Sequence, residues 1–394
     1  MAKVLFANIP AHGHINPTFP LVSALVKAGH SVDYLITEDF RRKVEYCGAK
    51  LIPCYRPFKI DFSDLLNLIK NMRKYIKKMN LKIKQLAPKY DVIFIGGMNP
   101  SISELEKEIE APIVHCSAVF FQSERTIEHL FKKSWGIPSS ICYLVLHPNA
   151  RKSFSRLVLS PALGMEIKDI LDIFKPQSST LNIAFTSRYF QPEDKDFDEK
   201  CLFIGPTPTI SVTDNSFPMS RLGTTYKKII YATLGTVYNN WIGFFKNVIE
   251  AFKNSEYIVV MSTGNKERLK EIGYIPDNFI VSDFVPQVYV LKHASLFITH
   301  GGMGSISDGI YYGVPMLLIP RGADQFFNAY RLQELQAGKV LRSEEVTPEN
   351  LKHEAGLIIE NKSFEVGVKR IWQSFINAGG PERALKEVEK ILKR

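Results

Sequence analysis

Two series of short apolar strands alternate with helical segments along the chain, and this alternation limits the fold more than any other feature. The first series has expected strands at Lys3–Ile9, Ser31–Thr37, Val92–Ile95 and Ile113–His115. The second series has expected strands at Ile229–Thr233, Tyr257–Met261, Phe279–Val281, Leu296–Thr299 and Pro315–Ile319. Strands joined by helices form parallel sheets that are covered by helices on both faces. The sequence therefore predicts an α/β protein with two doubly wound, Rossmann-like domains.

A charged stretch followed by a segment rich in Pro, Thr and Ser separates the two series. The 394 residues are enough for two domains of about 150–200 residues each. We place the N-terminal domain at 1–208, a linker at 209–227 and the C-terminal domain at 228–378. Residues 379–394 are expected to form a helix that packs back toward the N-terminal domain. Doubly wound sheets bind ligands at the carboxyl ends of their strands, so we expect a site in a cleft between the domains.

Composition argues against several classes of protein. No apolar run approaches the roughly 20 residues that cross a bilayer. The apolar stretch at the N-terminus is too short for a signal peptide, so we expect a cytoplasmic protein. The five cysteines are odd in number and widely spaced, which argues against a disulfide framework and against a cysteine-based zinc site.

The formal net charge is +10, and the densest basic run is Lys70–Lys84. Apolar residues recur there and just before it at helical spacing, at Leu65, Leu68, Ile69, Met72, Ile76 and Met79. The spacing predicts a helix with one apolar and one basic face. Such a helix either packs on its own domain or contacts an anionic membrane or an amphiphilic substrate. No nucleic-acid-binding motif accompanies the run, so we expect no nucleic acid partner.

The segment Phe284–Gln336 offers the most chemistry, because LFITHGGMGS reads as a buried strand, a turn of small residues and a helix. Free N–H groups and the positive dipole end of a helix favour an anion at such a turn. Ser305 and His300 carry donors suited to a phosphate. Taken alone, Gly302-x-Gly304 is a weak signal, and a tight strand-to-helix turn explains it equally well.

The loop PAHGHINP also follows a strand and precedes a helix. A histidine at a strand end is well placed to act as a general base, which suits His14. The alternatives are a zinc pair of His12 with His14, for which further ligands are missing, and a histidine that caps the loop. Asp194-Lys195-Asp196 has the form of a metal–diphosphate motif, but no strand precedes it and we expect a solvated loop.

Four motifs in order, FVPQ, THGGMGS, YYGVP and ADQFFNA, resemble the nucleotide-sugar signature of family 1 glycosyltransferases. PAHGHINP resembles the acceptor loop of that family, and YATLGT is similar to the strand and turn that open its donor domain. The resemblance is nearest to bacterial macrolide-type transferases and to those that modify antibiotics or flavonoids. It implies a GT-B fold and inverting transfer from a UDP-sugar, which is a co-substrate, with no cofactor and no metal.

The resemblance also implies roles for individual residues. Phe284 matches the residue that stacks on the uracil, and Val285 matches the residue that bonds the base through its backbone. Gln287 matches the residue that contacts the ribose. The residues matched to the diphosphate are Thr236, His300, Gly302, Gly304 and Ser305. Asp324 and Gln325 match the residues that bond the hydroxyls of the donor sugar. His14 matches the catalytic base, and His12 is expected to shape the loop.

Two positions depart from the family pattern. Asp308 stands where the family usually has a glutamate that bonds the ribose hydroxyls, and the aspartate side chain is one methylene shorter. Gly96 stands at the end of the fourth strand, where an aspartate usually orients the histidine base and stabilises its imidazolium form. Asn99, Ser101 or Glu104 is a possible replacement, and an acidic acceptor such as a phenol would need less help from the base.

The leading hypothesis is therefore transfer of a hexose, by default glucose, to a hydroxyl of a small lipophilic acceptor such as a flavonoid or macrolide. Its pocket is expected among the apolar stretches Phe58–Met79 and Phe120–Tyr143. The first alternative is a lipid or carotenoid glycosyltransferase that contacts the membrane peripherally through Lys70–Lys84. The second is a non-catalytic subunit that binds a nucleotide sugar, suggested by the glycine at position 96.

Overall fold

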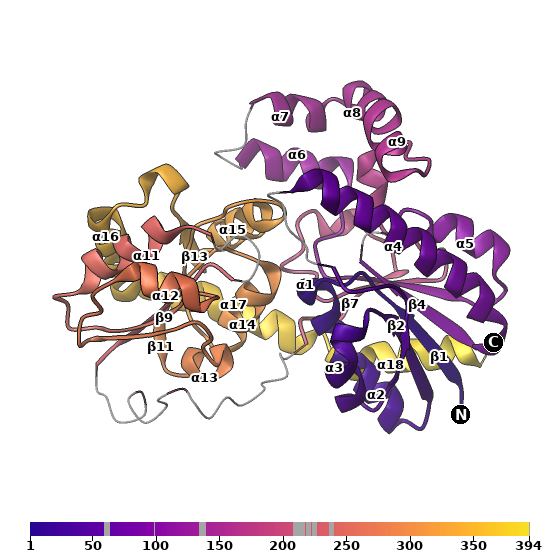
Figure 1. The fold of residues 1–394 in the computed structure, drawn as a ribbon, viewed down its shortest axis with the longest axis horizontal. Helices are drawn as coiled ribbons and strands as arrows, with labels where there is room; N and C mark the ends of the chain where they lie inside the picture. The colour runs from indigo at the N-terminus through magenta and orange to yellow at the C-terminus, as the bar shows by residue number, and fades with distance from the viewer. Residues whose placement is uncertain are drawn as a thin grey trace. The chain divides into compact units, whose positions relative to one another are not determined.

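The computed structural model describes residues 1–58, 64–97, 99–133, 139–207, 217, 222, 227–235 and 240–393. The chain forms two compact units. The first comprises residues 1–132, 137–207 and 374–394, and the second comprises 208–373 with the short segment 133–136. Each unit is built around one parallel sheet (Figure 1). The predicted α/β class with two Rossmann-like, parallel-sheet domains is confirmed.

The first unit contains a sheet of seven described strands in the order β3-β2-β1-β4-β5-β6-β7. Its strands are β1 Lys3–Ala7, β2 Ser31–Ile36, β3 Lys50–Pro53, β4 Val92–Gly96, β5 Ile113–Ser117, β6 Leu181–Ala184 and β7 Cys201–Phe203. Every pairing is parallel, and β1 lies between β2 and β4. The chain changes its direction of winding there, which places the ends of β1 and β4 at the switch point of the sheet.

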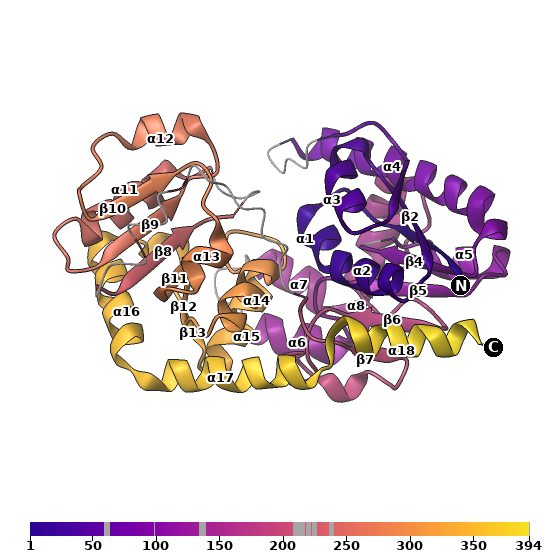
Figure 2. The ribbon, with the colours of Figure 1, turned by 90° about the horizontal axis from the view of Figure 1, so that it is seen from below.

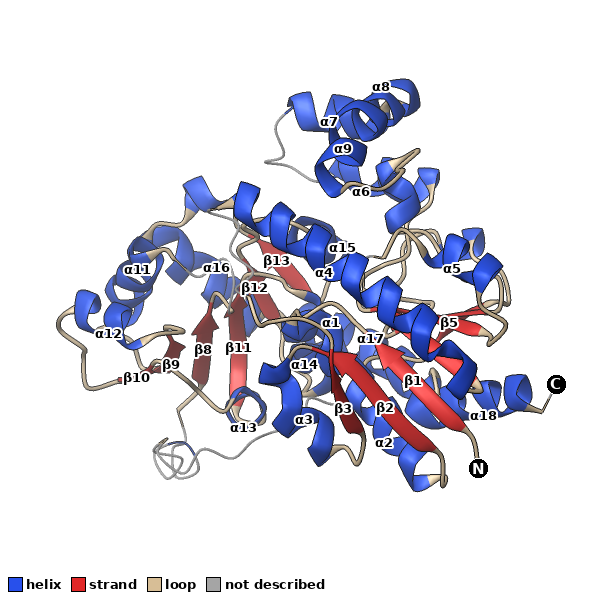
Figure 3. Cartoon of the chain, turned by 45° about the vertical axis from the view of Figure 1, so that its right-hand side comes forward, coloured by secondary structure: helices blue, strands red, loops and turns tan. Residues whose placement is uncertain are grey.

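Helices cover both faces of this sheet (Figure 3). The helices of the first unit are α1 His12–Ile15, α2 Phe19–Lys27, α3 Arg41–Tyr46, α4 Leu65–Leu86, α5 Ile102–Glu108, α6 Glu124–Lys133, α7 Ser139–Leu146, α8 Pro148–Phe154, α9 Ser160–Leu163 and α18 Gly380–Leu392. Among them, α2, α3 and α18 pack on one face of the sheet and α4 and α5 on the other. Val4 and Phe6 of β1 point into the core that α2 and α18 cover, whereas Leu5 and Ala7 point into the core under α4. The alternation of side chains along a strand therefore builds two cores from one strand.

The C-terminal helix α18 belongs to the first unit. It packs against α2 and contributes the fully buried residues Ala384 and Val388 to the core that contains Leu21 and Val22 (Figure 2). The border between the units falls within the preceding helix, α17 Lys362–Asn377.

The second unit contains six described strands in the order β10-β9-β8-β11-β12-β13, again all parallel. They are β8 Ile229–Thr233, β9 Ile258–Ser262, β10 Phe279–Ser282, β11 Ala294–Thr299, β12 Met316–Leu318 and β13 Gly338–Val340. Its helices are α11 Ile242–Phe252, α12 Lys266–Ile272, α13 Gln287–Leu291, α14 Met303–Tyr311, α15 Gln325–Glu334, α16 Pro348–Glu360 and most of α17. Here β8 and β11 occupy the switch point.

The helix α4 contains the basic run and extends beyond it at both ends. Its apolar residues Tyr75, Ile76, Met79 and Ile83 are buried against the sheet, while most of its basic residues are exposed. The apolar face thus packs on its own domain, as the first of the two sequence readings has it. None of the helices in the described parts of the chain is both long and apolar enough to cross a membrane.

The segment around Asp196 differs from the solvated loop expected there. Residues Asp194–Asp196 form a 3₁₀ turn, and the Asp196 carboxylate accepts a hydrogen bond from Ser123 Oγ at 2.5 Å. It also pairs with Arg125. Asp196 therefore fastens this segment to the start of α6, a role that the sequence pattern did not indicate.

Candidate active site

In the second unit, the turn between β11 and α14 places His300 in a slot made by glycines. A Cβ on Gly302 would lie 2.6 Å from His300 Nε2, and a Cβ on Gly235 would lie 2.4 Å from His300 Cε1. Neither position has room for a larger residue while the imidazole keeps its place. Gly301, which lies between His300 and Gly302 in the sequence, has a φ of 83°, a left-handed backbone that favours glycine.

Two further predicted residues lie at the same turn. Gly302 is the N-cap of α14, Gly304 lies in the first helical turn with open space where a side chain would start, and Ser305 follows it. Burial lowers the pKa of His300 to about 4, so its imidazole is neutral at pH 7 and carries one N–H donor. The free N–H groups of a helix N-terminus with a hydroxyl and an imidazole beside them suit an anionic ligand.

Gln287 and Asp308, both predicted to lie near the ribose, meet each other. Gln287 Nε2 donates to Asp308 Oδ2 at 2.7 Å, which joins the start of α13 to α14. Asp308 is 6% exposed, so one of its carboxylate oxygens is held inside the protein. Phe284 precedes α13 and is 55% exposed, whereas Val285 beside it is buried. An exposed phenyl ring next to buried backbone fits a stacking platform.

Asp324 and Gln325 lie at the N-terminus of α15. Burial raises the pKa of Asp324, and a 2.7 Å hydrogen bond from Asn328 Nδ2 to its Oδ2 opposes that rise. The Gln325 side-chain oxygen accepts hydrogen bonds from the backbone N–H of Arg321 at 2.9 Å and of Gly322 at 3.2 Å. The side-chain oxygen of Gln325 is therefore occupied by hydrogen bonds within its own loop, which leaves the side-chain amide nitrogen for a ligand.

Asn328 and the pair Arg321–Trp241 were missed by the sequence analysis. Asn328 is fully buried and also donates to Gly301 O at 3.2 Å, so one amide joins α15 to the His300 turn. Its spacing of four residues from Asp324 was a usable signal, because such residues share a helix face. The guanidinium carbon of Arg321 lies 4.3 Å from the ring centroid of Trp241, a contact that no local pattern indicates. Thr236, predicted to bind the diphosphate, lies outside the described residues.

In the first unit, the segment predicted to be a loop forms the short helix α1 and a 3₁₀ turn, Asn16–Thr18. Asn8 at the end of β1 fixes this turn. It is 1% exposed, donates from Nδ2 to His14 O at 3.1 Å, and accepts at Oδ1 from Ile9 N at 2.8 Å. His14 Nδ1 is buried and has no hydrogen-bond partner among the described residues. Burial lowers the pKa of His14 to about 4, which leaves the imidazole neutral at pH 7.

His12 differs from His14 in its surroundings. It is exposed, its ring centroid lies 4.9 Å from that of Phe40, and its Nδ1 lies 3.4 Å from Lys43 Nζ. Partial burial and the positive charge of Lys43 both lower the pKa of His12. Within the described parts of the chain, no three His, Cys, Asp or Glu side chains lie close enough to hold a metal ion.

The amide of Asn8 lies where a side chain at position 96 would begin. A Cβ on Gly96 would lie 2.4 Å from Asn8 Nδ2. The suggested replacements do not fill the role: Asn99 donates to Asn80 Oδ1 at 2.9 Å and accepts from Ser101 N at 3.1 Å. Ser101 and Glu104 also make no hydrogen bond to His14 Nδ1, which has no partner among the described residues. His14 therefore has its backbone fixed by an amide and its ring oriented by no described carboxylate.

Comparison with known proteins identifies the family of the chain. Residues 248–391 match the model of the erythromycin biosynthesis protein CIII-like C-terminal domain. Over 402 residues the chain is 31% identical to the uncharacterized UDP-glucosyltransferase YdhE of Bacillus subtilis, covering 100% of this chain and 99% of that protein. The chain belongs to the family 1 glycosyltransferases.

Two further comparisons support the assignment. The transferase is 31% identical over 404 residues to the NDP-glycosyltransferase YjiC of Bacillus licheniformis, covering 98% of this chain and 96% of that protein. The crystal structure of the calicheamicin glycosyltransferase CalG4 superposes with a TM-score of 0.77 at 25% identity, covering 100% of this chain and 99% of that one. The two Rossmann-like domains are those of a GT-B glycosyltransferase of the natural-product type.

Proposed function

We propose that this glycosyltransferase moves a hexose, glucose by preference, from a UDP-sugar to a hydroxyl of a small lipophilic acceptor. The proposed transfer inverts the anomeric centre, needs neither metal nor cofactor, takes place in the cytoplasm and uses His14 as general base. The observation that carries the proposal is the β11–α14 turn, where His300, the N-terminus of α14 and Ser305 converge. The name of YdhE, a UDP-glucosyltransferase, supports the choice of donor.

The donor half of the reaction follows from the second unit. UDP leaves with negative charge that grows as the anomeric bond breaks. Fixed N–H donors at a helix N-terminus, together with a neutral imidazole and a hydroxyl, stabilise that charge without a metal. Phe284 would stack on the uracil. The Asp324 carboxylate, held by Asn328, would accept hydrogen bonds from the sugar hydroxyls.

The acceptor half depends on His14. Its neutral ring can accept the proton that the acceptor hydroxyl loses on attack. A histidine whose pKa lies near 4, without an orienting carboxylate, is a weak base. A weak base suits an acidic hydroxyl, so we favour phenolic acceptors such as flavonoids over simple alcohols. The names of the relatives favour neither a lipid glycosyltransferase nor a non-catalytic subunit.

The experiment incubates the protein with UDP-glucose and a panel of phenols, flavonoids, macrolides and sterols in the presence of EDTA. Mass spectrometry then detects a hexose adduct. We expect an adduct with wild type and with His12→Ala, and a loss of about 10²–10⁴-fold in rate with His14→Ala. Transfer by His14→Ala at the wild-type rate would rule out the base. Activity that disappears with EDTA and returns with a divalent cation would rule out the metal-free mechanism.

A further inference from the structure

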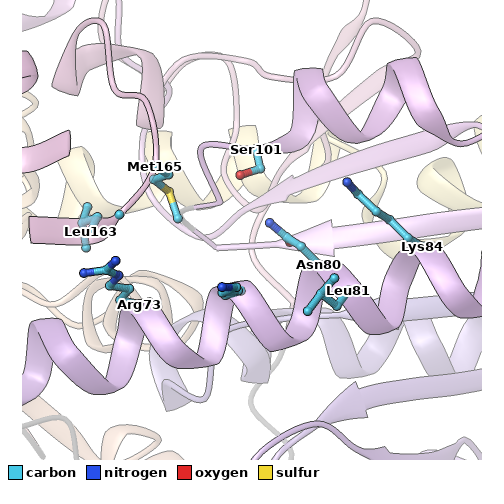
Figure 4. A pocket seen from close by; sticks show the side chains of 9 residues that line it. Arg73, Asn80, Leu81, Lys84, Ser101, Leu163 and Met165 are labelled. Atoms are coloured by element: carbon cyan, nitrogen blue, oxygen red, sulfur yellow. The ribbon is translucent and has the colours of Figure 1, made fainter. Parts of the chain in front are cut away.

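The first unit contains a cavity of about 280 Å³ on the flank of α4, away from the sheet. Five residues of α4 border it, and Ser101 and the segment Leu163–Met165 complete its wall. Figure 4 shows Arg73, Asn80 and Lys84 projecting from α4 on the side that carries Leu163, Met165 and Ser101. We call this cavity the α4 pocket. A water molecule occupies about 30 Å³, so the α4 pocket has room for a ligand of roughly ten non-hydrogen atoms.

The charge in the α4 pocket is positive and only partly compensated. Arg73, Lys77 and Lys84 line it, and no acidic residue does. Lys84 is paired with Glu108 at 2.6 Å. Arg73 and Lys77, one helical turn apart, donate no hydrogen bond to any residue in the described parts of the chain. These two exposed cations are therefore available to an anionic ligand.

The rest of the wall offers both hydrogen-bond donors and apolar surface. Asn80 uses its oxygen to accept from Asn99, which leaves its NH₂ group as a donor, and Ser101 adds a hydroxyl. Leu81, Leu163 and Met165 supply the apolar surface. A ligand that matches this lining carries several acceptor oxygens and a short apolar group.

Gly164 permits Arg73 to lie where it does. The glycine ends α9 with a φ of 65°, and a Cβ on it would lie 2.4 Å from the Arg73 guanidinium carbon. The guanidinium is thus packed against the backbone turn at the rim of the α4 pocket.

We propose that the α4 pocket binds a phosphate monoester with a short apolar substituent. The two charges of the monoester balance Arg73 and Lys77, and its oxygens accept from both cations, from Asn80 and from Ser101. The apolar substituent lies against Leu81, Leu163 and Met165. This site lies within the first unit and shares no residue with the donor site or with His14.

Calorimetric titration with hexyl phosphate at about 50 mM salt tests the site, because low salt keeps charge contacts measurable. We expect wild type to bind it more tightly than inorganic phosphate. We expect Arg73→Gln/Lys77→Gln to weaken binding by at least about tenfold, since both charge-assisted contacts are removed. The matched control, Lys70→Gln/Lys74→Gln, removes two exposed charges from the same helix outside the pocket and should stay within about twofold of wild type.

The proposal is overturned if wild type binds no hexyl phosphate, or if the two double variants weaken it equally. It is also overturned if inorganic phosphate binds as tightly as the ester, because the apolar wall would then contribute nothing. Co-sedimentation with vesicles that contain phosphatidic acid, a lipid whose headgroup is a phosphate monoester, identifies the source of the phosphate. Loss of vesicle binding in the pocket variant alone assigns a lipid headgroup, and equal vesicle binding by all three proteins assigns a free phosphate ester.

Discussion

The Asn8 side chain fills the space that a carboxylate at position 96, near His14, would need. A Cβ on Gly96 would lie 2.4 Å from Asn8 Nδ2 and 2.6 Å from Asn8 Cγ. Gly96→Asp, which restores the family residue, therefore has to displace a side chain that is 1% exposed. The displaced amide would lose its bonds with His14 O and Ile9 N.

The cost of this substitution follows from these contacts. Forcing extra atoms into a packed site costs about 1–3 kcal/mol, and two lost hydrogen bonds add about 1 kcal/mol each. We expect Gly96→Asp to lower the free energy of unfolding by about 3–5 kcal/mol. Urea unfolding followed by circular dichroism measures the change. Gly13→Asp is the matched control, because a Cβ on Gly13 meets no atom within 4 Å, and its effect should stay within about 0.5 kcal/mol.

The double variant Asn8→Gly/Gly96→Asp tests the cause of the loss. Removing the Asn8 side chain makes room, so the double variant should be more stable than the sum of the single losses by about 1–3 kcal/mol. Its carboxylate can then approach His14, and we expect transfer to a simple alcohol to improve relative to Asn8→Gly alone. Wild-type stability of Gly96→Asp, or strict additivity in the double variant, would refute the reasoning.

Three further predictions concern buried polar groups. Asn328→Leu removes the donor to the Asp324 carboxylate, so steady-state kinetics should show a KM for UDP-glucose raised about tenfold or more. Burial lowers the pKa of His115 to about 4. As the pH falls from 6.5 toward 4, the unfolded state takes up a proton at this residue and the folded state does not, so the free energy of unfolding falls by about 3 kcal/mol. His115→Gln should therefore reduce the fall in urea midpoint between pH 7 and pH 4.5, and an unchanged fall would contradict this. Arg151→Met leaves the Asp169 carboxylate buried without its 2.7 Å partner and should cost about 3–5 kcal/mol in urea unfolding, most of which Arg151→Met/Asp169→Leu should recover.

The sequence predicted the fold well where a strand is a buried apolar run of five or six residues. The run Ile229–Thr233 coincides with β8, and the ends of most other predicted strands lie within two residues of the observed ones. The sequence analysis missed β3, β6, β7 and β13, which are strands of three or four residues. Three of them, β3, β7 and β13, lie at the edge of a sheet, and β3 and β13 each carry a lysine. Such strands form because a neighbouring strand offers them hydrogen bonds, and this is a property of the sheet and not of the segment.

In the candidate site, too, the sequence revealed the residues of continuous motifs and did not reveal the contacts between distant segments. Residues that share one turn, such as His300, Gly302 and Ser305, were found because their motif is continuous in sequence. The contact between Asn8 and Gly96 crosses from the end of β1 to the end of β4, and the sequence shows only that a family residue is missing. What fills its place depends on how two strands pair, so it required the structure.

The packing of α18 into the first core also sets the order in which the chain can fold during synthesis. The core that begins with Val4 is completed by Ala384 and Val388, near the other end of the sequence. The second unit is made of residues that leave the ribosome before α18 does, and it can close its own sheet while the first core still lacks one helix. The domain that is translated first is thus completed last, and its exposed α2 face must stay soluble throughout translation.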